Sequence, residues 1–116
     1  YEVAANAIVI TVSGGHLKGP ASADGLLPNC SGLEARWMGE VGHAVTEQGL
    51  DYEEANNLVN KLIRKYEHVF DIPGGNPGVP FSQAYDLETA QPTREWFLLY
   101  QQVREEVRAM GLRALS

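Results

Sequence analysis

The sequence predicts an α/β chain that is mostly helical and carries one or two short strands. Apolar residues recur at helical spacing, between recognisable start and stop signals, over 31–48, 51–70 and 93–110. Between the first helical pattern and these three, the glycine-flanked segment 16–19 is predicted to form a short buried strand. One strand cannot make a sheet, so we expect it to pair with strands outside these 116 residues.

The opening segment, 1–13, is predicted to be a helix that stops at Gly14 and Gly15. The β-branched run 8–12 would also suit a strand, but the alanine-rich first half favours a helix. The segment is apolar from its first residue, whereas chain termini are usually polar and loosely held. We therefore expect this chain to be the C-terminal piece of a longer protein.

The helix over 31–48 is expected to begin with a capping box formed by Ser31 and Glu34. Gly39 and Gly42 weaken this helix but allow another segment to approach it closely. The next helix, 51–70, should be capped by Asp51. The short turn between the two helices predicts that they pack as an antiparallel pair.

The segment 71–81 is rich in proline and glycine and is predicted to be a loop, followed by a short turn at 82–85. The last helix, 93–110, should be capped by Thr93 and stopped by Gly111. Six of its residues are expected to face inward: Trp96, Leu99, Tyr100, Val103, Val107 and Met110.

The composition of the chain argues against several classes of function. The net charge of −6 argues against a nucleic-acid-binding surface and weakly against docking on an anionic membrane. The apolar runs all fall short of the roughly 20 residues that span a bilayer. The single Cys30 rules out an internal disulfide and fits a reducing cytoplasm.

Candidate chemistry is sparse. Glu40 and His43 form one Glu-x-x-His half-motif, whereas a carboxylate di-iron site needs two, so a partly exposed helix-face pair is favoured over a metal site. The best functional candidate is the stretch 14–25. His16 and Lys18 would share one face of its strand, either facing a cavity or lying on an exposed turn, and the residues alone leave both options open.

An ordered set of short motifs covers most of the chain and resembles the C-terminal part of the monomethylamine:corrinoid methyltransferases of methylotrophic methanogens. The main motifs are Thr11-Val12-Ser13-Gly14-Gly15-His16-Leu17, Gly32-Leu33-Glu34-Ala35-Arg36-Trp37-Met38-Gly39-Glu40-Val41, Lys65-Tyr66-Glu67, Tyr85-Asp86-Leu87 and Pro92-Thr93-Arg94-Glu95-Trp96. The set spans about the last quarter of such an enzyme.

The resemblance implies a fold and a division of the chain. The family has a TIM (β/α)8 barrel, so 1–13 would be its seventh helix, 16–19 its eighth strand and 22–25 the loop after that strand. Residues 1–28 would form the last helix, strand and loop of the barrel, and residues 29–116 the C-terminal helices, all within a single domain.

The resemblance also implies an activity: transfer of a methyl group from monomethylamine to the cobalt of a separate corrinoid protein, in methanogenesis from methylamines. The family's catalytic pyrrolysine lies upstream, so no catalytic residue is carried over and the fragment alone should be inactive. The corrinoid cofactor stays on the partner protein, and the full-length enzyme should be a cytoplasmic homo-oligomer. His16, Lys18 and Asp24 would line the cavity mouth or the corrinoid-docking surface, while Glu34 and Arg36 would cap and brace the following helix.

A second interpretation is a stand-alone helical interaction module without catalytic activity. It would hold a partner in a groove lined by Trp37, Trp96 and Tyr100. An independent small enzyme is disfavoured, because we find no complete catalytic constellation in the sequence.

Overall fold

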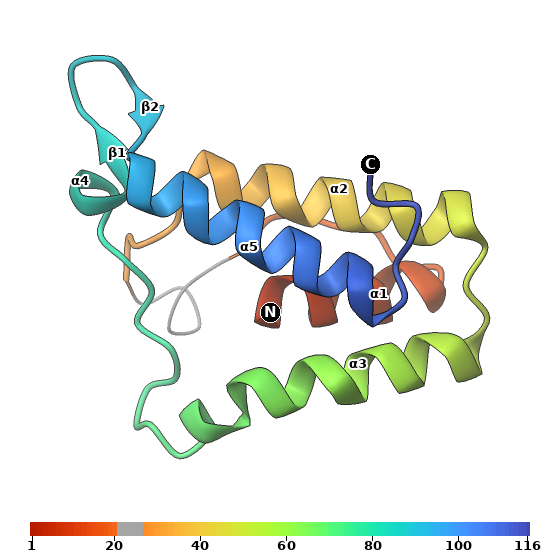
Figure 1. The fold of residues 1–116 in the computed structure, drawn as a ribbon. Helices are drawn as coiled ribbons and strands as arrows, with labels where there is room; N and C mark the ends of the chain where they lie inside the picture. The colour runs from red at the N-terminus through yellow and green to blue at the C-terminus, as the bar shows by residue number, and fades with distance from the viewer. Residues whose placement is uncertain (21–26) are drawn as a thin grey trace.

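The computed structural model describes residues 1–20 and 27–116, which form a mostly helical structure with one small sheet (Figure 1). Its elements are α1 (Glu2–Val12), α2 (Gly32–Gln48), α3 (Tyr52–Tyr66), the 3₁₀ helix η2 (Glu67–Val69), α4 (Phe81–Ala84), β1 (Tyr85–Asp86), β2 (Gln91–Pro92) and α5 (Arg94–Met110). The helices predicted over 1–13, 31–48 and 93–110 are confirmed to within a residue or two. The one predicted over 51–70 ends earlier, at Tyr66, and continues as η2.

Helix α1 lies between α2 and α3 and contacts both of them (Figure 1). Ala4, Ala7 and Ile8 are completely buried there, because small side chains let the three helix backbones come close together. Helices α2 and α3 run antiparallel, as expected, but the prediction that they pack against each other is wrong. The turn joins only their ends, and α1 occupies the space between them.

The helix caps are partly as predicted. Asp51 and Glu54 form a complete capping box on α3, and Thr93 accepts a hydrogen bond from the Trp96 amide at the start of α5. The capping box predicted for α2 is wrong, because the Ser31 side chain makes no capping bond. The Ser31 hydroxyl instead donates to the Glu34 carboxylate.

The strand predicted over 16–19 is not present: residues 15–20 follow α1 without regular secondary structure. The strands that do form are β1 and β2, which pair antiparallel with each other through Tyr85–Pro92 and Asp86–Gln91. A parallel strand needs neighbours for its hydrogen bonds, and this two-stranded sheet provides none for 16–19. The expectation of one or two short strands is thus met, but at a different place.

The close approach predicted at Gly42 is confirmed. A Cβ atom at this position would lie 2.6 Å from Cδ1 of Leu17, so the absence of a side chain lets the segment after α1 pack against α2. The same prediction for Gly39 is wrong, since nothing lies within 4 Å of a Cβ atom there.

Two carboxylates attach α5 to the other helices. Glu40 on α2 accepts hydrogen bonds from the Tyr100 hydroxyl at 2.5 Å and from the Arg104 guanidinium at 3.5 Å. On the other side of α5, Glu106 accepts hydrogen bonds from the Tyr1 hydroxyl at 2.8 Å and pairs with the Lys65 ammonium at 3.1 Å. Helix α5 is therefore connected to α1, α2 and α3 by charged hydrogen bonds.

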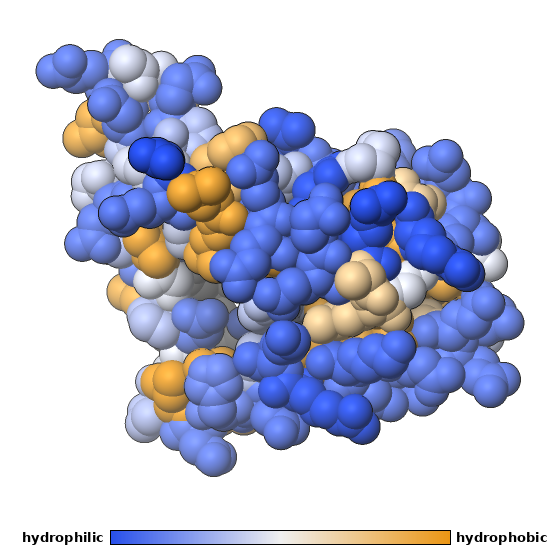
Figure 2. All heavy atoms as spheres, in the orientation of Figure 1, coloured by the Kyte–Doolittle hydropathy of each residue, from blue (hydrophilic) through white to orange (hydrophobic). Residues whose placement is uncertain are grey.

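Two regions of the surface differ in hydropathy (Figure 2). The outer face of α3 is hydrophilic, whereas apolar side chains reach the surface along the first half of α5. Among them, Phe97, Leu98 and Leu99 are 38–50% exposed. Of these three residues only Leu99 was predicted to face inward, so its exposure departs from the prediction.

The Glu106 contacts predict a dependence of stability on pH. Hydrogen bonds from Gln102, Tyr1 and Lys65 lower the pKa of Glu106 to about 2 from an ordinary value of 4.5. A carboxyl whose folded pKa is lowered stabilises the fold above its unfolded pKa, and that stability is lost as the pH falls. We therefore expect Glu106→Gln to weaken the decline in unfolding free energy between about pH 4.5 and pH 2, measured by urea titration.

The matched control for this prediction is Glu105→Gln, which changes the neighbouring carboxylate on the exposed side of α5. Its pH profile should follow that of the unmodified chain. Equal profiles for both variants would show that the Glu106 contacts do not stabilise the fold.

Candidate functional site

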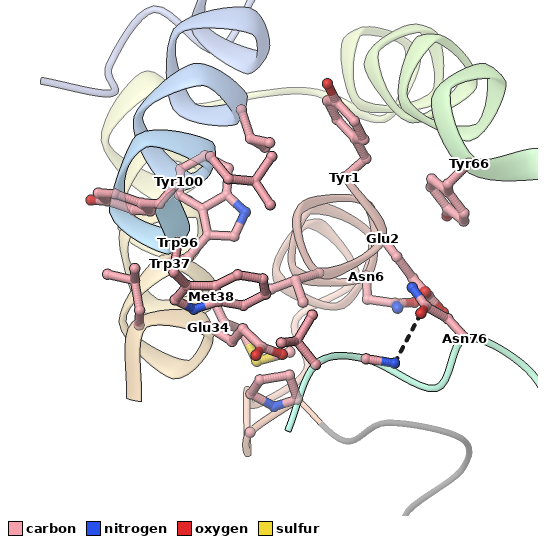
Figure 3. Close-up of a pocket in the computed structure, with 18 of the residues that line it drawn as sticks. Tyr1, Glu2, Asn6, Glu34, Trp37, Met38, Tyr66, Asn76, Trp96 and Tyr100 are labelled. Atoms are coloured by element: carbon pink, nitrogen blue, oxygen red, sulfur yellow. Dashed lines mark hydrogen bonds between the residues drawn. The ribbon is translucent and has the colours of Figure 1, made fainter. Parts of the chain in front are cut away.

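The candidate site is an open groove of about 660 Å³ between α1, α2, α5 and the loop after η2 (Figure 3). Its lining residues are Tyr1, Glu2, Val3, Asn6 and Ile10 around α1; Gly19 and Pro20 after it; Leu33, Glu34, Trp37 and Met38 on α2; Tyr66 on α3; Gly75, Asn76, Gly78 and Val79 in the loop; and Trp96, Leu99, Tyr100 and Val103 on α5. The opposite side of α1 is the one buried against α2 and α3, with Ala4, Ala7 and Ile8 completely buried, whereas its groove side carries both polar and apolar residues.

The groove brings together the three aromatic residues that the interaction-module interpretation singled out. Trp37 and Tyr100 meet edge to face, with ring centroids 6.0 Å apart. Trp96 is tied to the start of α2, because its indole Nε1 donates a hydrogen bond of 3.1 Å to the hydroxyl of Ser31, the N-cap of that helix. Residues far apart in the sequence therefore form one aromatic wall.

Much of the inward face predicted for α5 also belongs to this groove. Val107 is completely buried, but Trp96, Leu99, Tyr100 and Val103 line the groove instead of a closed core. Helical periodicity identifies the apolar face of a helix, but not whether that face is covered. The predicted inward face is confirmed for Tyr100, Val103, Val107 and Met110, which lie in the core or pack against it, whereas Leu99 is 45% exposed.

Glu34 introduces a carboxyl group into this largely apolar surrounding. Burial raises the pKa of Glu34 above its ordinary value, and the hydrogen bond from the Ser31 hydroxyl, 3.2 Å long, partly opposes that rise. Glu34 thus belongs to the groove in addition to lying in the first turn of α2. Arg36 points elsewhere: it pairs with Glu40 at 2.7 Å and lies over the Tyr100 ring.

The structure places His16 and Lys18 on the exposed segment after α1, outside the groove lining. The next residues, Gly19 and Pro20, do reach the groove. Asp24 lies outside the described residues. The assignment of these three polar residues to a cavity mouth or docking surface of the longer protein stays a prediction.

Sequence reasoning missed three polar residues of the groove: Glu2, Asn6 and Asn76. Asn6 carries the clearest signal, because it interrupts an otherwise apolar helix on the side opposite the buried alanines. The contribution of Asn76 could not be found this way, since it depends on how the loop after η2 folds back towards α1 (Figure 3).

Metal binding gains no support from the Glu-x-x-His motif. The Glu40 carboxylate already accepts hydrogen bonds from Arg36, Tyr100 and Arg104, and His43 is exposed. Within residues 1–20 and 27–116, no group of three or more His, Cys, Asp or Glu side chains could hold a metal ion.

The helices within these same residues were also compared with the length and hydropathy that a membrane span needs, and none of them meets both requirements.

Comparisons with known proteins agree with one another. The family model described as monomethylamine methyltransferase MtmB matches residues 1–112. Among curated relatives, MtmB1 of Methanosarcina acetivorans and MtmB of Methanosarcina mazei are each 36% identical over 114 residues, covering 96% of this chain and 24% of each relative. The crystal structure of Methanosarcina barkeri monomethylamine methyltransferase (MtmB) superposes with a TM-score of 0.82 at 35% identity, over 95% of this chain and 24% of the other.

The fold, mostly helical with a short two-stranded sheet, is therefore similar to one section of the solved monomethylamine methyltransferase, as expected for part of a TIM-barrel enzyme. The chain belongs to the monomethylamine methyltransferase MtmB family. It spans about a quarter of the length of the curated relatives it matches. The family resemblance found in the sequence is confirmed.

The contacts of Ser31 predict that Ser31→Ala changes both the stability of the chain and the titration of Glu34. The variant leaves Trp96 Nε1 without its acceptor and removes the hydroxyl donor of Glu34, while the hydrogen bond from the Ser31 backbone amide to Glu34 is kept. We expect the free energy of unfolding to fall by about 1–2 kcal/mol. The pKa of Glu34 should rise further, because a hydrogen bond that lowers it is lost, and carboxyl NMR titration measures this change.

The control is Ser82→Ala, which removes an exposed hydroxyl from α4. It should leave both quantities unchanged. An unchanged Glu34 titration in Ser31→Ala would contradict the hydrogen-bond assignment.

Proposed function

We propose that this chain forms part of an enzyme that transfers the methyl group of monomethylamine to the cobalt of a corrinoid carried by a cognate protein, in methanogenesis from methylamines. The observation that carries the proposal is the family match over residues 1–112, together with the superposition on a solved monomethylamine methyltransferase. Family membership supports the reaction class and the amine substrate.

In this proposal the chain acts as a scaffold and does not supply the reacting group. We place the catalytic pyrrolysine, and the acidic and amide side chains that work with it, in the part of the enzyme outside these residues. The chain alone is then inactive. We place the corrinoid on the partner protein and assign it no ligand among the side chains of this chain.

The exposed segment after α1 is proposed to face the corrinoid protein. His16 and Lys18 are both exposed there, where they can meet a partner surface without leaving a buried charge unpaired. Asp24, which lies outside the described residues, is assigned the same role. Their role is electrostatic and positional, because exposed charges at the rim of an interface mainly affect association rate and orientation. The assembled enzyme is proposed to be a homo-oligomer.

The alternative, a stand-alone interaction module, is favoured by one observation: Trp37, Trp96 and Tyr100 line the same open groove. Trp and Tyr are enriched where proteins bind one another. The DNA preceding the codon for Tyr1 distinguishes the two proposals. A reading frame that continues upstream across one amber codon supports the methyltransferase, whereas a start codon beside Tyr1 supports the module.

A chimera tests the proposed reaction. The quarter of the M. barkeri enzyme that matches this chain is replaced by residues 1–112, and methylation of the corrinoid protein is followed by the cobalt absorbance spectrum with monomethylamine as donor. We expect the chimera to transfer methyl groups and the isolated chain to show no transfer. The M. barkeri enzyme lacking that quarter is the matched control and should also be inactive.

A folded chimera without methyl transfer would contradict the proposed function. Circular dichroism and size-exclusion chromatography establish the folded state independently of activity. Transfer by the isolated chain would contradict the scaffold role.

A further inference from the structure

The tip of the β1–β2 hairpin presents one leucine to solvent. The side chain of Leu87 is 68% exposed, and the hairpin projects from one end of the molecule (Figure 1). Single exposed apolar residues are common and need no explanation by themselves. Leu87 differs from them because the turn that carries it is rigid.

Asp86 holds this turn through three hydrogen bonds. Its carboxylate Oδ1 accepts from the amides of Glu88, at 2.9 Å, and Thr89, at 3.0 Å, and its carbonyl accepts from the amide of Ala90 at 2.9 Å. Ala90 has a φ of 55°, a left-handed conformation that is uncommon for residues other than glycine. A turn fixed in this way loses little conformational entropy on binding, so Leu87 is preorganised as an anchor.

A cavity of about 220 Å³ lies at the other end of the molecule, where α2, α3 and the end of α5 meet. Its apolar lining residues are Leu50, Leu58 and Met110. A cavity of about 150 Å³ holds the six-carbon ring of benzene. The cavity of about 220 Å³ therefore has room for the four-carbon side chain of one leucine.

The tip and the cavity also differ in charge. Asp86 and Glu88 stand on either side of the tip leucine and are acidic. The cavity is lined by two cations, Lys61 and Arg113, which are both exposed. Its lining includes one carboxylate, that of Glu54, which already accepts a hydrogen bond from the backbone at the start of α3. An acidic partner with an apolar centre therefore fits the cavity.

One copy of the chain cannot bring its own tip and cavity together, because α5, with 17 residues and a length of about 25 Å, lies between them. We propose that the hairpin tip of one copy inserts Leu87 into the cavity of a second copy, where Glu88 faces Lys61 and Arg113. The contact is heterologous, so its repetition gives a ring or an open chain of copies. The inference rests on the homo-oligomer of the proposed function and names its interface, but its test requires no methyl transfer.

The first test is analytical ultracentrifugation of the complete 116-residue chain at increasing concentration. Such a contact is small, so we expect weak, reversible association that strengthens as the salt concentration falls. Leu87→Asp should raise the dissociation constant about tenfold or more, the loss expected when one leucine is no longer buried. Leu98→Asp is the matched control and should change nothing, because Leu98 is 50% exposed on α5 and belongs to neither the tip nor the cavity.

A mixture of two variants tests which surfaces meet. Leu87→Asp loses the tip and keeps the cavity, whereas Arg113→Glu keeps the tip and places a carboxylate where Glu88 would bind. Each variant alone should be monomeric at the concentration at which the unmodified chain associates, and circular dichroism establishes that each is folded. The equimolar mixture contains one intact tip for each intact cavity, so it should form a one-to-one dimer and nothing larger.

If the isolated chain associates, equal association of the Leu87 and Leu98 variants, or a mixture that forms no dimer, would overturn the inference. If the isolated chain stays monomeric, a chimera that carries all 116 residues decides: Leu87→Asp should lower its oligomeric mass, and an unchanged mass would overturn the inference. An interface that behaves as expected in a chimera without methyl transfer would refute the proposed reaction and leave the interface standing.

Discussion

The packing of α1 between α2 and α3 is the constraint on which the rest of the structure depends. Ala4, Ala7 and Ile8 are fully buried because a helix can be inserted between two others only if its facing side chains are small or fit closely. Without α1, the two longer helices would meet only at the turn that joins them. The other side of α1 is thereby fixed as one wall of the groove, so that one element determines both the core and the candidate site.

The groove follows from how α5 is held. Charged hydrogen bonds that the Glu40 and Glu106 carboxylates accept fix this helix at two points, and its C-terminal half closes over the core with Val107. Its N-terminal half stands away from α1 and leaves Trp96, Leu99 and Tyr100 facing open space. A stripe of apolar residues that is half covered is typical of a surface that binds another polypeptide.

Helix positions could be predicted from the sequence because they depend on local signals: apolar spacing, the Asp51 cap and the glycines after α2 and α5. The insertion of α1 between α2 and α3 could not be predicted, because helical periodicity does not indicate which helices become neighbours. The strand expected at 16–19 depends on pairing partners that the described residues do not supply. The sequence singles out the aromatic residues of the groove, whereas the lack of an acceptor for the buried Trp37 Nε1 among the described residues appears only in three dimensions.

Amide hydrogen exchange of the complete chain tests the central role of α1 most directly. If α1 holds the helices together, the amides of its buried residues, such as Ala7 and Ile8, exchange only when the whole structure unfolds. Their protection should then equal that of the slowest amides in α2 and α3. Rapid exchange in α1, with α2 and α3 still protected, would show that those two helices are stable without it and would contradict this account.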